Sequence, residues 1–406
     1  MSASSKEKGS GSDCVMNRVS VAAALIVLLS PRPDIQAQAN GRMSVNPGAD
    51  PHQQSESQSD FSVNAEGEQE LQKGTALTRD GHFAEAIPHL AAARGRVTNE
   101  YAASFNLALC YVATGDYKRA TAVLTDLRHG HDNADVENLL AQAYIGNGQD
   151  KDALTTVERA AAMSPQNEKL YVFVADSCTD HQDFALGLQI ADLGLRNLPQ
   201  SARLHYERGV LLANIDRLDE AKTDFELAAK LAPEGEIGYL SRAEQSRLNG
   251  DIAAAVTIAR EGIAKGFPNP VLLTVLGEAL LRSGIAPGQP EFAEAQSALE
   301  KSVAERPNDP TSQIALGQIE LQAGLLDDAI SHLEKARQMK PNQPAVYASL
   351  AKAYQRKGDA QRAQEALAAL EKLNLARADQ IRNAPGERKM SYAGTQGSDE
   401  KQQTPK

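Results

Sequence analysis

The sequence predicts an all-α solenoid of about nine stacked helix–turn–helix units. A glycine or alanine recurs every 33 or 34 residues, with one longer interval of 40 residues. These first small residues are Gly74, Ala108, Ala141, Ala175, Gly209, Ala243, Gly277, Gly317 and Ala351. A second small residue follows twelve positions after nearly every one, at Ala86, Ala120, Ala153, Gly187, Ala221, Ala255, Ala329 and Ala363. Two small residues in each period of about 34 indicate paired helices that stack into an array.

Each unit is expected to hold a first helix, a tight turn and a second helix. Small residues are needed where the helix axes cross, because a large side chain there would force the backbones apart. Larger apolar residues recur around them at helical spacing, as at Leu107, Tyr111 and Leu124. Many turns carry a glycine, which adopts the left-handed cap conformation at no steric cost: Gly81, Gly115, Gly148, Gly250, Gly324 and Gly358. A proline usually ends the second helix: Pro165, Pro199, Pro233, Pro307 and Pro341.

Two stretches of the second unit carry a recognisable motif. Residues 106–111 read Asn-Leu-Ala-Leu-Cys-Tyr, and residues 115–120 read Gly-Asp-Tyr-Lys-Arg-Ala. In these marks the chain resembles the tetratricopeptide repeat family, with nine units in register over residues 67–377. The resemblance implies a right-handed superhelical solenoid whose first helices line a concave groove that binds proteins or peptides. The fourth unit departs from the pattern with Gln182 at its turn and Gly187 at its second small position, so looser packing is expected there.

Composition limits the classes of partner. The net charge is −11, and no block of Lys and Arg with interleaved aromatic residues occurs in the repeats. This disfavours nucleic acid as a partner. Apolar residues make up 42% of the chain but aromatic residues only 4%, which is typical of thin helix–helix seams filled by Ala and Leu.

The N-terminus predicts export. Arg18 precedes an apolar run from Val19 to Leu29, and an Ala-x-Ala pattern ends at Ala39. Basic residue, short apolar run and small-residue site are the three parts of a secretory signal peptide. We therefore expect a signal peptide over residues 1–39, cleavage after Ala39, and a periplasmic or secreted protein. The alternative is an uncleaved helix that anchors the repeats to the inner membrane, outside the cytoplasm. Either Met1 or Met16 serves as the start.

The segments flanking the repeats are polar. Residues 40–66 are rich in Ser, Gln, Asn and Gly, which predicts a disordered linker. Residues 378–406 are expected to form a capping segment and a disordered tail, and residues 376–382 could form a final helix over the last unit. Cys110 and Cys178 fall on first helices two units apart, so we expect buried, unbridged thiols.

The seventh unit carries an insertion. Its second small residue, Ala295, comes six residues late, and the added residues lie near Ser283–Pro290. Two prolines and two glycines disfavour a continued helix there. An exposed loop is therefore expected.

No catalytic or metal-binding constellation stands out. The sequence His129-Gly130-His131-Asp132 lies where one unit joins the next, and Asp180-His181-Gln182-Asp183 lies on a turn. Neither offers three or four convergent ligands, and both are interpreted as solvated loops. Phosphate-binding, dinucleotide-binding, nucleophile-elbow and zinc-protease motifs are missing from the sequence. We therefore expect no enzyme, no cofactor and no metal.

The favoured function is an exported scaffold that binds a protein or peptide in cell-envelope assembly or export. Alternatives are a glycan-handling or enzyme-associated subunit, and a membrane-anchored adaptor. By the family resemblance, residues three before and one after each first small residue face the groove. The apolar ones in the first five units are the candidate partner-binding residues: Leu71, Phe105, Leu109, Val172, Tyr206 and Val210. Phe105 and Tyr206 are the expected anchors, unless these side chains pack against neighbouring first helices.

Overall fold

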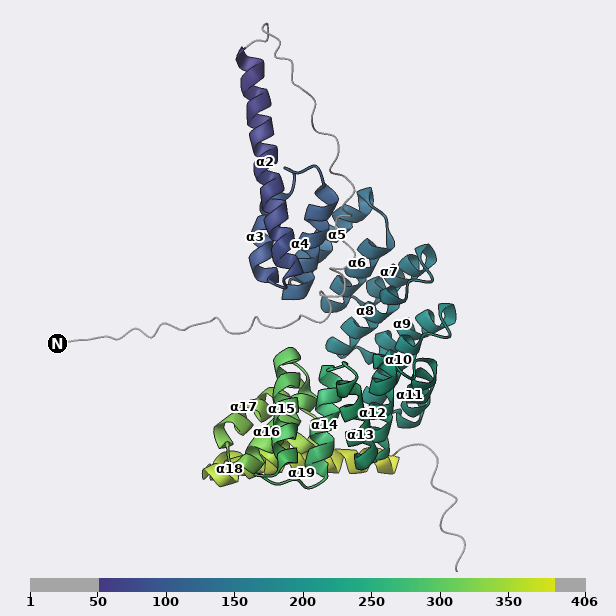
Figure 1. Ribbon diagram of the computed structural model, residues 1–406, viewed down its shortest axis with the longest axis vertical. Coiled ribbons are helices and arrows are strands. Elements are labelled where there is room, and N and C mark those ends of the chain that lie inside the picture. The colour runs from purple at the N-terminus through teal and green to yellow at the C-terminus, as the bar shows by residue number, and fades with distance from the viewer. Residues whose placement is uncertain (1–50, 384–406) are drawn as a thin grey trace, which may run out of the picture. The chain divides into compact units, whose positions relative to one another are not determined.

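The computed structural model describes the backbone of residues 51–383 and the side chains of residues 65–378. Over this range the fold is all-α, as predicted, and consists of helices joined by short turns (Figure 1). The predicted signal peptide, its cleavage site and the two possible starts lie outside the described residues. So do residues 40–50 of the predicted linker and residues 384–406 of the predicted tail.

Within residues 51–383 the helices form nine consecutive pairs, one pair for each predicted unit. We call the first member of a pair the A helix and the second the B helix. The pairs are α2 (Pro51–Arg79) and α3 (Phe83–Ala93), α4 (Glu100–Thr114) and α5 (Tyr117–Gly130), α6 (Ala134–Gly146) and α7 (Asp150–Met163), α8 (Glu168–Asp180) and α9 (Phe184–Asn197), α10 (Ala202–Asn214) and α11 (Leu218–Leu231), α12 (Glu236–Asn249) and α13 (Ile252–Ala264), α14 (Pro270–Arg282) and α15 (Pro290–Glu305), α16 (Pro310–Ala323) and α17 (Leu326–Met339), and α18 (Pro344–Lys357) and α19 (Ala360–Asn383).

The helices belong to two compact bodies, one ending at Ala279 and the other beginning at Leu280. In the first body, each A helix packs against its own B helix, and each B helix from α3 to α11 packs against the next A helix. The same order holds from α15 to α19 in the second body. Each unit therefore buries its apolar faces against its sequence neighbours, as expected for a solenoid.

The small residues lie at close helix crossings. A methyl group added to Gly74 would lie 2.6 Å from Cγ of Leu90, and one added to Gly317 would lie 2.7 Å from Cγ of Leu333. Such separations are far below van der Waals contact. The small residues are therefore required by helix approach, which was the physical basis of the prediction.

The fourth unit is closely packed despite its unusual residues. A methyl group on Gly187 would lie 2.7 Å from Cδ2 of Leu211 and 3.1 Å from Cβ of Cys178. Gln182 adopts the left-handed turn conformation itself, with φ of 60°. The expectation of looser packing in this unit is therefore wrong.

Two helices extend into segments that were predicted to be a disordered linker and a separate capping helix. The predicted disordered linker 40–66 is helical from Pro51 onward, because no glycine or proline interrupts the chain between Pro51 and Gly67. At the other end, residues 376–382 form no separate capping helix. They continue α19, which runs unbroken for 24 residues and ends shortly before Pro385.

The insertion of the seventh unit forms the predicted loop. It lies between the end of α14 at Arg282 and the start of α15 at Pro290. Nearly all of its residues are exposed, and Ile285 is half-buried. The side chain of Gln289 accepts a 2.8 Å hydrogen bond from the backbone N–H of Ala286.

Candidate protein-binding surface

The A helices form the inner side of each stack. Consecutive A helices contact one another from α2 through α12 in the first body, and α16 contacts α18 in the second. Among the described B helices, a comparable contact joins α7 to α9. Closer approach of the A helices means that each stack curves toward them. The surface that they present is the one that the family resemblance assigns to partner binding.

The six predicted binding residues are mostly buried on this side. Leu71, Phe105, Leu109, Val172 and Tyr206 have exposed fractions of 8% or less, and Val210 is half-buried. The Phe105 ring stacks on Tyr101 with centroids 5.6 Å apart. The Tyr206 ring lies 5.8 Å from that of Phe225 on the B helix of the same unit. Phe105 and Tyr206 are therefore packing residues, and their expected role as exposed anchors is corrected.

The more accessible position is the one directly after each first small residue, which we call the inner row. Its members from the fourth unit to the eighth are half-buried: Asp176, Val210, Glu244, Glu278 and Gln318. Thr75 in the first unit is also half-buried, and Lys352 in the ninth is exposed. Only Leu109 and Gln142 of this row are fully covered. The inner row is therefore mainly polar, with carboxylates at three of the four consecutive positions from Asp176 to Glu278.

Charged groups of α8 and α10 are linked across adjacent units. The Arg203 guanidinium lies 2.5 Å from Oε1 of Glu207 and 3.9 Å from Oδ2 of Asp176. It also lies over the ring of Tyr206, 5.9 Å from the centroid. The negative charge of Glu207, with a smaller contribution from Asp176, raises the pKa of Arg203 despite its burial. Arg203 therefore stays ionised and holds these carboxylates in place.

A second cluster lies on α12 and α14. The Arg247 guanidinium lies 2.7 Å from Oε2 of Glu244. The charge of Glu244, and less strongly that of Glu278, raises the pKa of Arg247. Together the two clusters contain four carboxylates (Asp176, Glu207, Glu244 and Glu278) and two guanidiniums (Arg203 and Arg247), which leaves a formal charge of −2.

Neither arginine was predicted from the sequence to reach the groove. Arg203 lies six residues before its first small residue and Arg247 four residues after, so neither occupies a position assigned to the groove. Their side chains nevertheless reach the inner row. A charge-pair search at helical spacing of three or four residues would have found Arg203 with Glu207 and Glu244 with Arg247.

Asn138 and Gln142 present amide groups on α6. Gln142 donates from Nε2 to Oδ1 of Asn138 over 2.8 Å, and both side chains are buried. Oε1 of Gln142 has no hydrogen-bond partner among the described residues. A buried acceptor without a partner costs about 1–3 kcal/mol of stability, and because Gln142 is fully covered this cost falls on the packing beneath the inner row.

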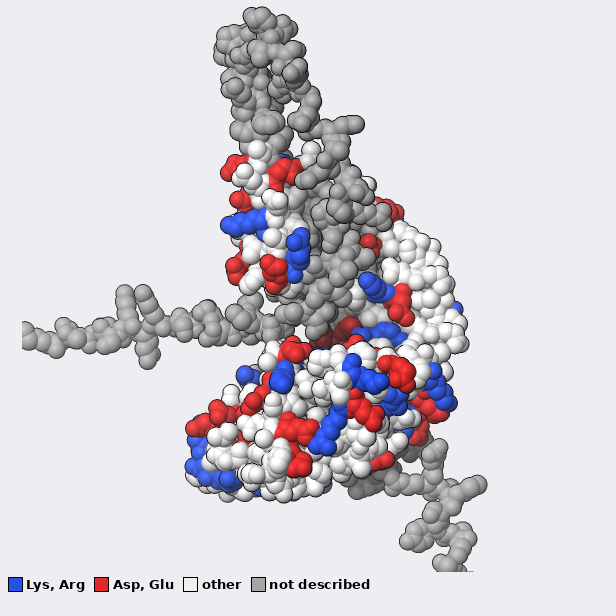
Figure 2. Space-filling model, viewed as in Figure 1, with Lys and Arg blue, Asp and Glu red and all other residues white. Residues whose placement is uncertain are grey.

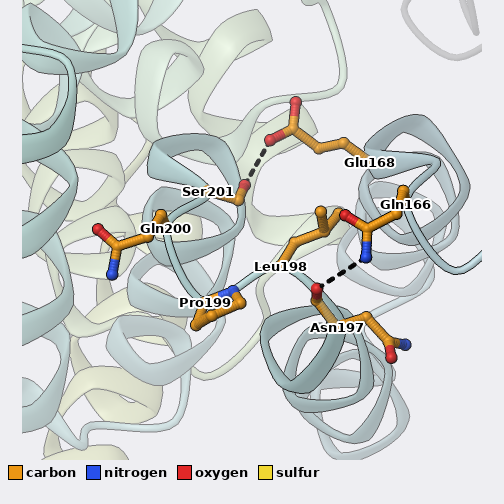
Figure 3. Close-up of a pocket in the computed structure, with 7 residues that line it drawn as sticks. All are labelled: Gln166, Glu168, Asn197, Leu198, Pro199, Gln200 and Ser201. Atoms are coloured by element: carbon orange, nitrogen blue, oxygen red, sulfur yellow. Dashed lines mark hydrogen bonds between the residues drawn. The ribbon is translucent and has the colours of Figure 1, made fainter.

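A separate small cleft lies between the loops that follow α7 and α9. Its volume is about 340 Å³, and the residues that line it, polar except for Leu198 and Pro199, are shown in Figure 3. Gln166 donates to the backbone carbonyl of Asn197 over 3.2 Å, and the Ser201 hydroxyl donates to Glu168 over 2.5 Å. Both bonds join residues near the start of α8 to residues at the end of α9 or the start of α10, so the cleft lies at a junction between successive units.

Within the described side chains, no group of three His, Cys, Asp or Glu residues could hold a metal ion. His181 contacts the hydroxyl of Tyr117 at 3.0 Å and the carbonyl of Ser177 at 2.8 Å. Both described cysteines are unbridged and buried, as predicted. Burial raises the pKa of the Cys110 thiol to about 11 and also raises that of Cys178. Thiolate chemistry is therefore suppressed at both sites.

Charges of both signs are intermixed on the surface. On the face drawn in Figure 2, Lys and Arg alternate with Asp and Glu, and no continuous basic patch appears. None of the helices in the described range has the length and apolar character needed to cross a membrane. The apolar run at residues 19–29 lies outside that range.

The same repeats match known protein families. Tetratricopeptide repeat models match residues 77–143 and 320–382, residues 288–344, and residues 202–234. The chain is similar to the TPR repeat-containing protein YpiA of Bacillus subtilis, with 25% identity over 295 residues. That match covers 71% of this chain but only 59% of YpiA.

The chain is similar to two solved structures. Yeast Tom70 matches with a TM-score of 0.50 and 15% identity, covering 90% of this chain and 71% of Tom70. A tetratricopeptide repeat protein from Parabacteroides merdae matches with a TM-score of 0.44 and 18% identity, covering 62% of this chain and 98% of its own length. At 15% identity the likeness to Tom70 concerns the fold alone.

Proposed function

Because this chain belongs to the tetratricopeptide repeat family, whose fold typically serves as a protein-binding scaffold, we propose that it is an exported scaffold without enzymatic activity. It holds a segment of a partner protein along the inner row of the first body. The observation that carries this proposal is the run of half-buried residues Asp176, Val210, Glu244 and Glu278 on four consecutive A helices.

The inner row defines the chemistry of the proposed partner segment. Three of the four positions carry carboxylates, and the whole group of six charged residues has an excess of two negative charges. Val210 adds one apolar contact between them. A segment with Lys or Arg side chains on either side of an apolar residue complements this surface, since opposite charges across an interface direct association and register.

Export rests on the pattern of residues 1–39, and a role in envelope assembly or export follows from that location.

The glycan-handling alternative is less favoured. Glycan sites use exposed aromatic platforms, whereas Phe105 and Tyr206 are buried.

Site-specific photo-crosslinking tests the binding surface. A photoreactive residue at Val210 should capture a protein from an envelope extract of the native host. The same residue at Glu226, which is exposed on the B helix of that unit, serves as the matched control. Capture at Val210 should weaken in the triple variant Asp176→Asn, Glu244→Gln, Glu278→Gln. Equal capture at Glu226, or capture that is unchanged in the triple variant, contradicts binding at the inner row.

N-terminal sequencing of protein from the native host tests export separately. A mature chain beginning at Asn40 in the periplasmic or extracellular fraction supports the signal peptide. An intact N-terminus in the membrane fraction would instead favour the anchored adaptor. An intact N-terminus in the cytosolic fraction rules out both.

A further inference from the structure

One position of the B helices is buried in every unit except the last. This position, four residues after the second small residue, is fully buried in the first eight units: Leu90, Leu124, Val157, Ala191, Phe225, Ala259, Leu299 and Leu333, each with 0% exposure. Its counterpart in the ninth unit, Leu367, is 44% exposed. The last B helix therefore lacks a contact that every earlier one has.

The missing contact is the one made by a following A helix. Each earlier B helix lies between its own A helix and the next, as the surroundings of Gly194 show. A methyl group there would lie 2.8 Å from Tyr171 of α8 and 2.9 Å from Leu204 of α10. For α19, the described contact is with α18. One apolar side of α19 is therefore uncovered.

The uncovered side continues beyond the usual length of a B helix. Leu370 is half-buried, and Leu375 is 61% exposed, the highest value among the large apolar side chains described. We call Leu367, Leu370 and Leu375 the open seam. Glu371, also exposed, lies between them and gives the seam a negative charge.

The opposite end of the array has no such seam. The exposed residues of α2 in the described side chains are mainly polar, including Gln69, Gln72 and Lys73. A head-to-tail contact between two copies would therefore place polar residues on Leu367. A two-fold contact could instead pair Leu367 of one copy with Leu375 of the other. Position 371 is midway between these two residues, so Glu371 of one copy would face Glu371 of the other. Like charges facing each other across the interface oppose such a dimer.

We propose that residues Arg388–Tyr392 of this chain fold back along α19 and cover the open seam with Met390 and Tyr392. These are the large apolar side chains among residues 384–406, which lie outside the described range. Arg388 and Lys389 precede them directly and complement the charge of Glu371. Pro385 and Gly386 follow the end of α19 and allow the chain to reverse.

The distances agree with this register. Leu375 lies eight residues before Asn383, about 12 Å along the helix at 1.5 Å per residue. Met390 lies four residues after Gly386, about 13 Å in extended chain at 3.3 Å per residue. Tyr392 reaches about 20 Å, between Glu371 at about 18 Å and Leu367 at about 24 Å. Met390 therefore meets Leu375, and Tyr392 meets the seam between Glu371 and Leu367.

Disulfide trapping in the full chain tests the contact. In a background of Cys14→Ser, Cys110→Ala and Cys178→Ala, the pair Leu375→Cys and Met390→Cys should form an intramolecular disulfide under mild oxidation. The matched control combines Leu375→Cys with Thr404→Cys, which lies in the same tail outside the proposed register. Peptide mass spectrometry should show several-fold more disulfide for the first pair. Equal yields for the two pairs, or a disulfide found only between two chains, overturn the proposal.

Hydrogen exchange supplies a second readout without cysteines. In the variant Met390→Ser, Tyr392→Ser, amides of residues 367–378 should exchange several-fold faster, while those of α4 to α13 stay unchanged. The same exchange rates in the variant and the parent chain would show that these residues do not cover α19.

Discussion

Gln182 holds a φ angle of 60° in the turn after α8, the same left-handed conformation that Gly148 holds at 70° in the preceding unit. The position seven residues after the first small residue has positive φ in all nine units. Seven are glycine: Gly81, Gly115, Gly148, Gly250, Gly284, Gly324 and Gly358. The other two are Gln182 and Asp216, the latter with φ of 61°. Turn geometry is therefore constant although the residue is not.

Glycine at the two exceptional turns should stabilise the array. A side chain in the left-handed region costs about 1–2 kcal/mol, and the greater unfolded-state entropy of glycine offsets part of the gain. We expect Gln182→Gly and Asp216→Gly each to raise the free energy of unfolding by about 0.5–1 kcal/mol. Urea unfolding followed by circular dichroism measures the change.

The reverse substitution at a glycine turn is the control. Gly250 has φ of 72°, so Gly250→Ala should lower the free energy of unfolding by about 1 kcal/mol. If all three variants shift stability in the same direction, left-handed strain is not the cause.

Repeat number, helix pairing and turn positions could be predicted from the sequence because they depend on local requirements. Gly317 must be small because Leu333 lies against it, and that requirement appears as a periodic residue. The same periodicity predicted one helix before and one helix after the insertion at residues 283–290. Positions set by neighbours within one or two units are therefore readable from spacing alone.

The properties that could not be predicted depend on what surrounds a residue. The spacing of Phe105 assigned it to the inner side, but not whether Tyr101 would cover it. Val210, at an equivalent spacing to Leu109, remains half-buried. The start of α2 was also missed, because the polar residues before Gly67 suggested disorder although no glycine or proline occurs between Pro51 and Gly67. A polar composition shows that a segment has few side chains to bury, but it does not show where a helix ends.

Gly317 offers a test of the helix-crossing argument. A methyl group there would lie 2.7 Å from Cγ of Leu333 and 3.1 Å from the carbonyl oxygen of Ala329. Gly317→Ala should therefore lower the free energy of unfolding by about 1–3 kcal/mol through overpacking, although alanine is the better helix former. Gly130, at the end of α5, has no atom within 4 Å of an added methyl group. Gly130→Ala should leave stability unchanged or slightly higher in the same thermal melts, and an equal loss in both variants would refute the crowding explanation.

Glu320 should make stability depend on pH. Burial, reinforced by the negative charges of Asp328 and Glu300, raises the pKa of Glu320 to about 7. Oε1 lies 3.5 Å from Nε2 of His332, but burial lowers the pKa of that imidazole. His332 also bonds through Nδ1 to Oε1 of Gln313 at 2.6 Å. Because Gln313 Oε1 can only accept, Nδ1 carries the proton and Nε2 of the neutral ring is left without one. The neutral ring therefore does not compensate the carboxylate.

The sign of the pH effect follows from proton binding. Between the ordinary glutamate pKa of about 4.3 and about 7, the folded state holds the proton more tightly than the unfolded state. Stability therefore falls as pH rises through this window. Glu320→Gln should raise the free energy of unfolding by about 1–3 kcal/mol at pH 8 and change it little at pH 4. Glu305→Gln, at an exposed position of α15, is the matched control, and the same pH dependence in both variants would exclude Glu320 as its source.

The seventh-unit insertion should be removable. Gly284 has φ of 84° at the standard turn position, so the turn itself is already complete before the added residues. Deleting Ile285–Pro290 joins Gly284 to Glu291-Phe292 and recreates the spacing of Gly115-Asp116-Tyr117 in the second unit. The lost residues are mostly exposed, and shorter loops cost less closure entropy. The melting temperature should therefore stay within a few degrees of the parent chain.

Replacement of Ile285–Pro290 by six Gly and Ser residues, which keeps the length, is the control. A large loss in both variants would show that Ile285 packs into the array, and a loss confined to the deletion would show that α14 and α15 need the longer connection.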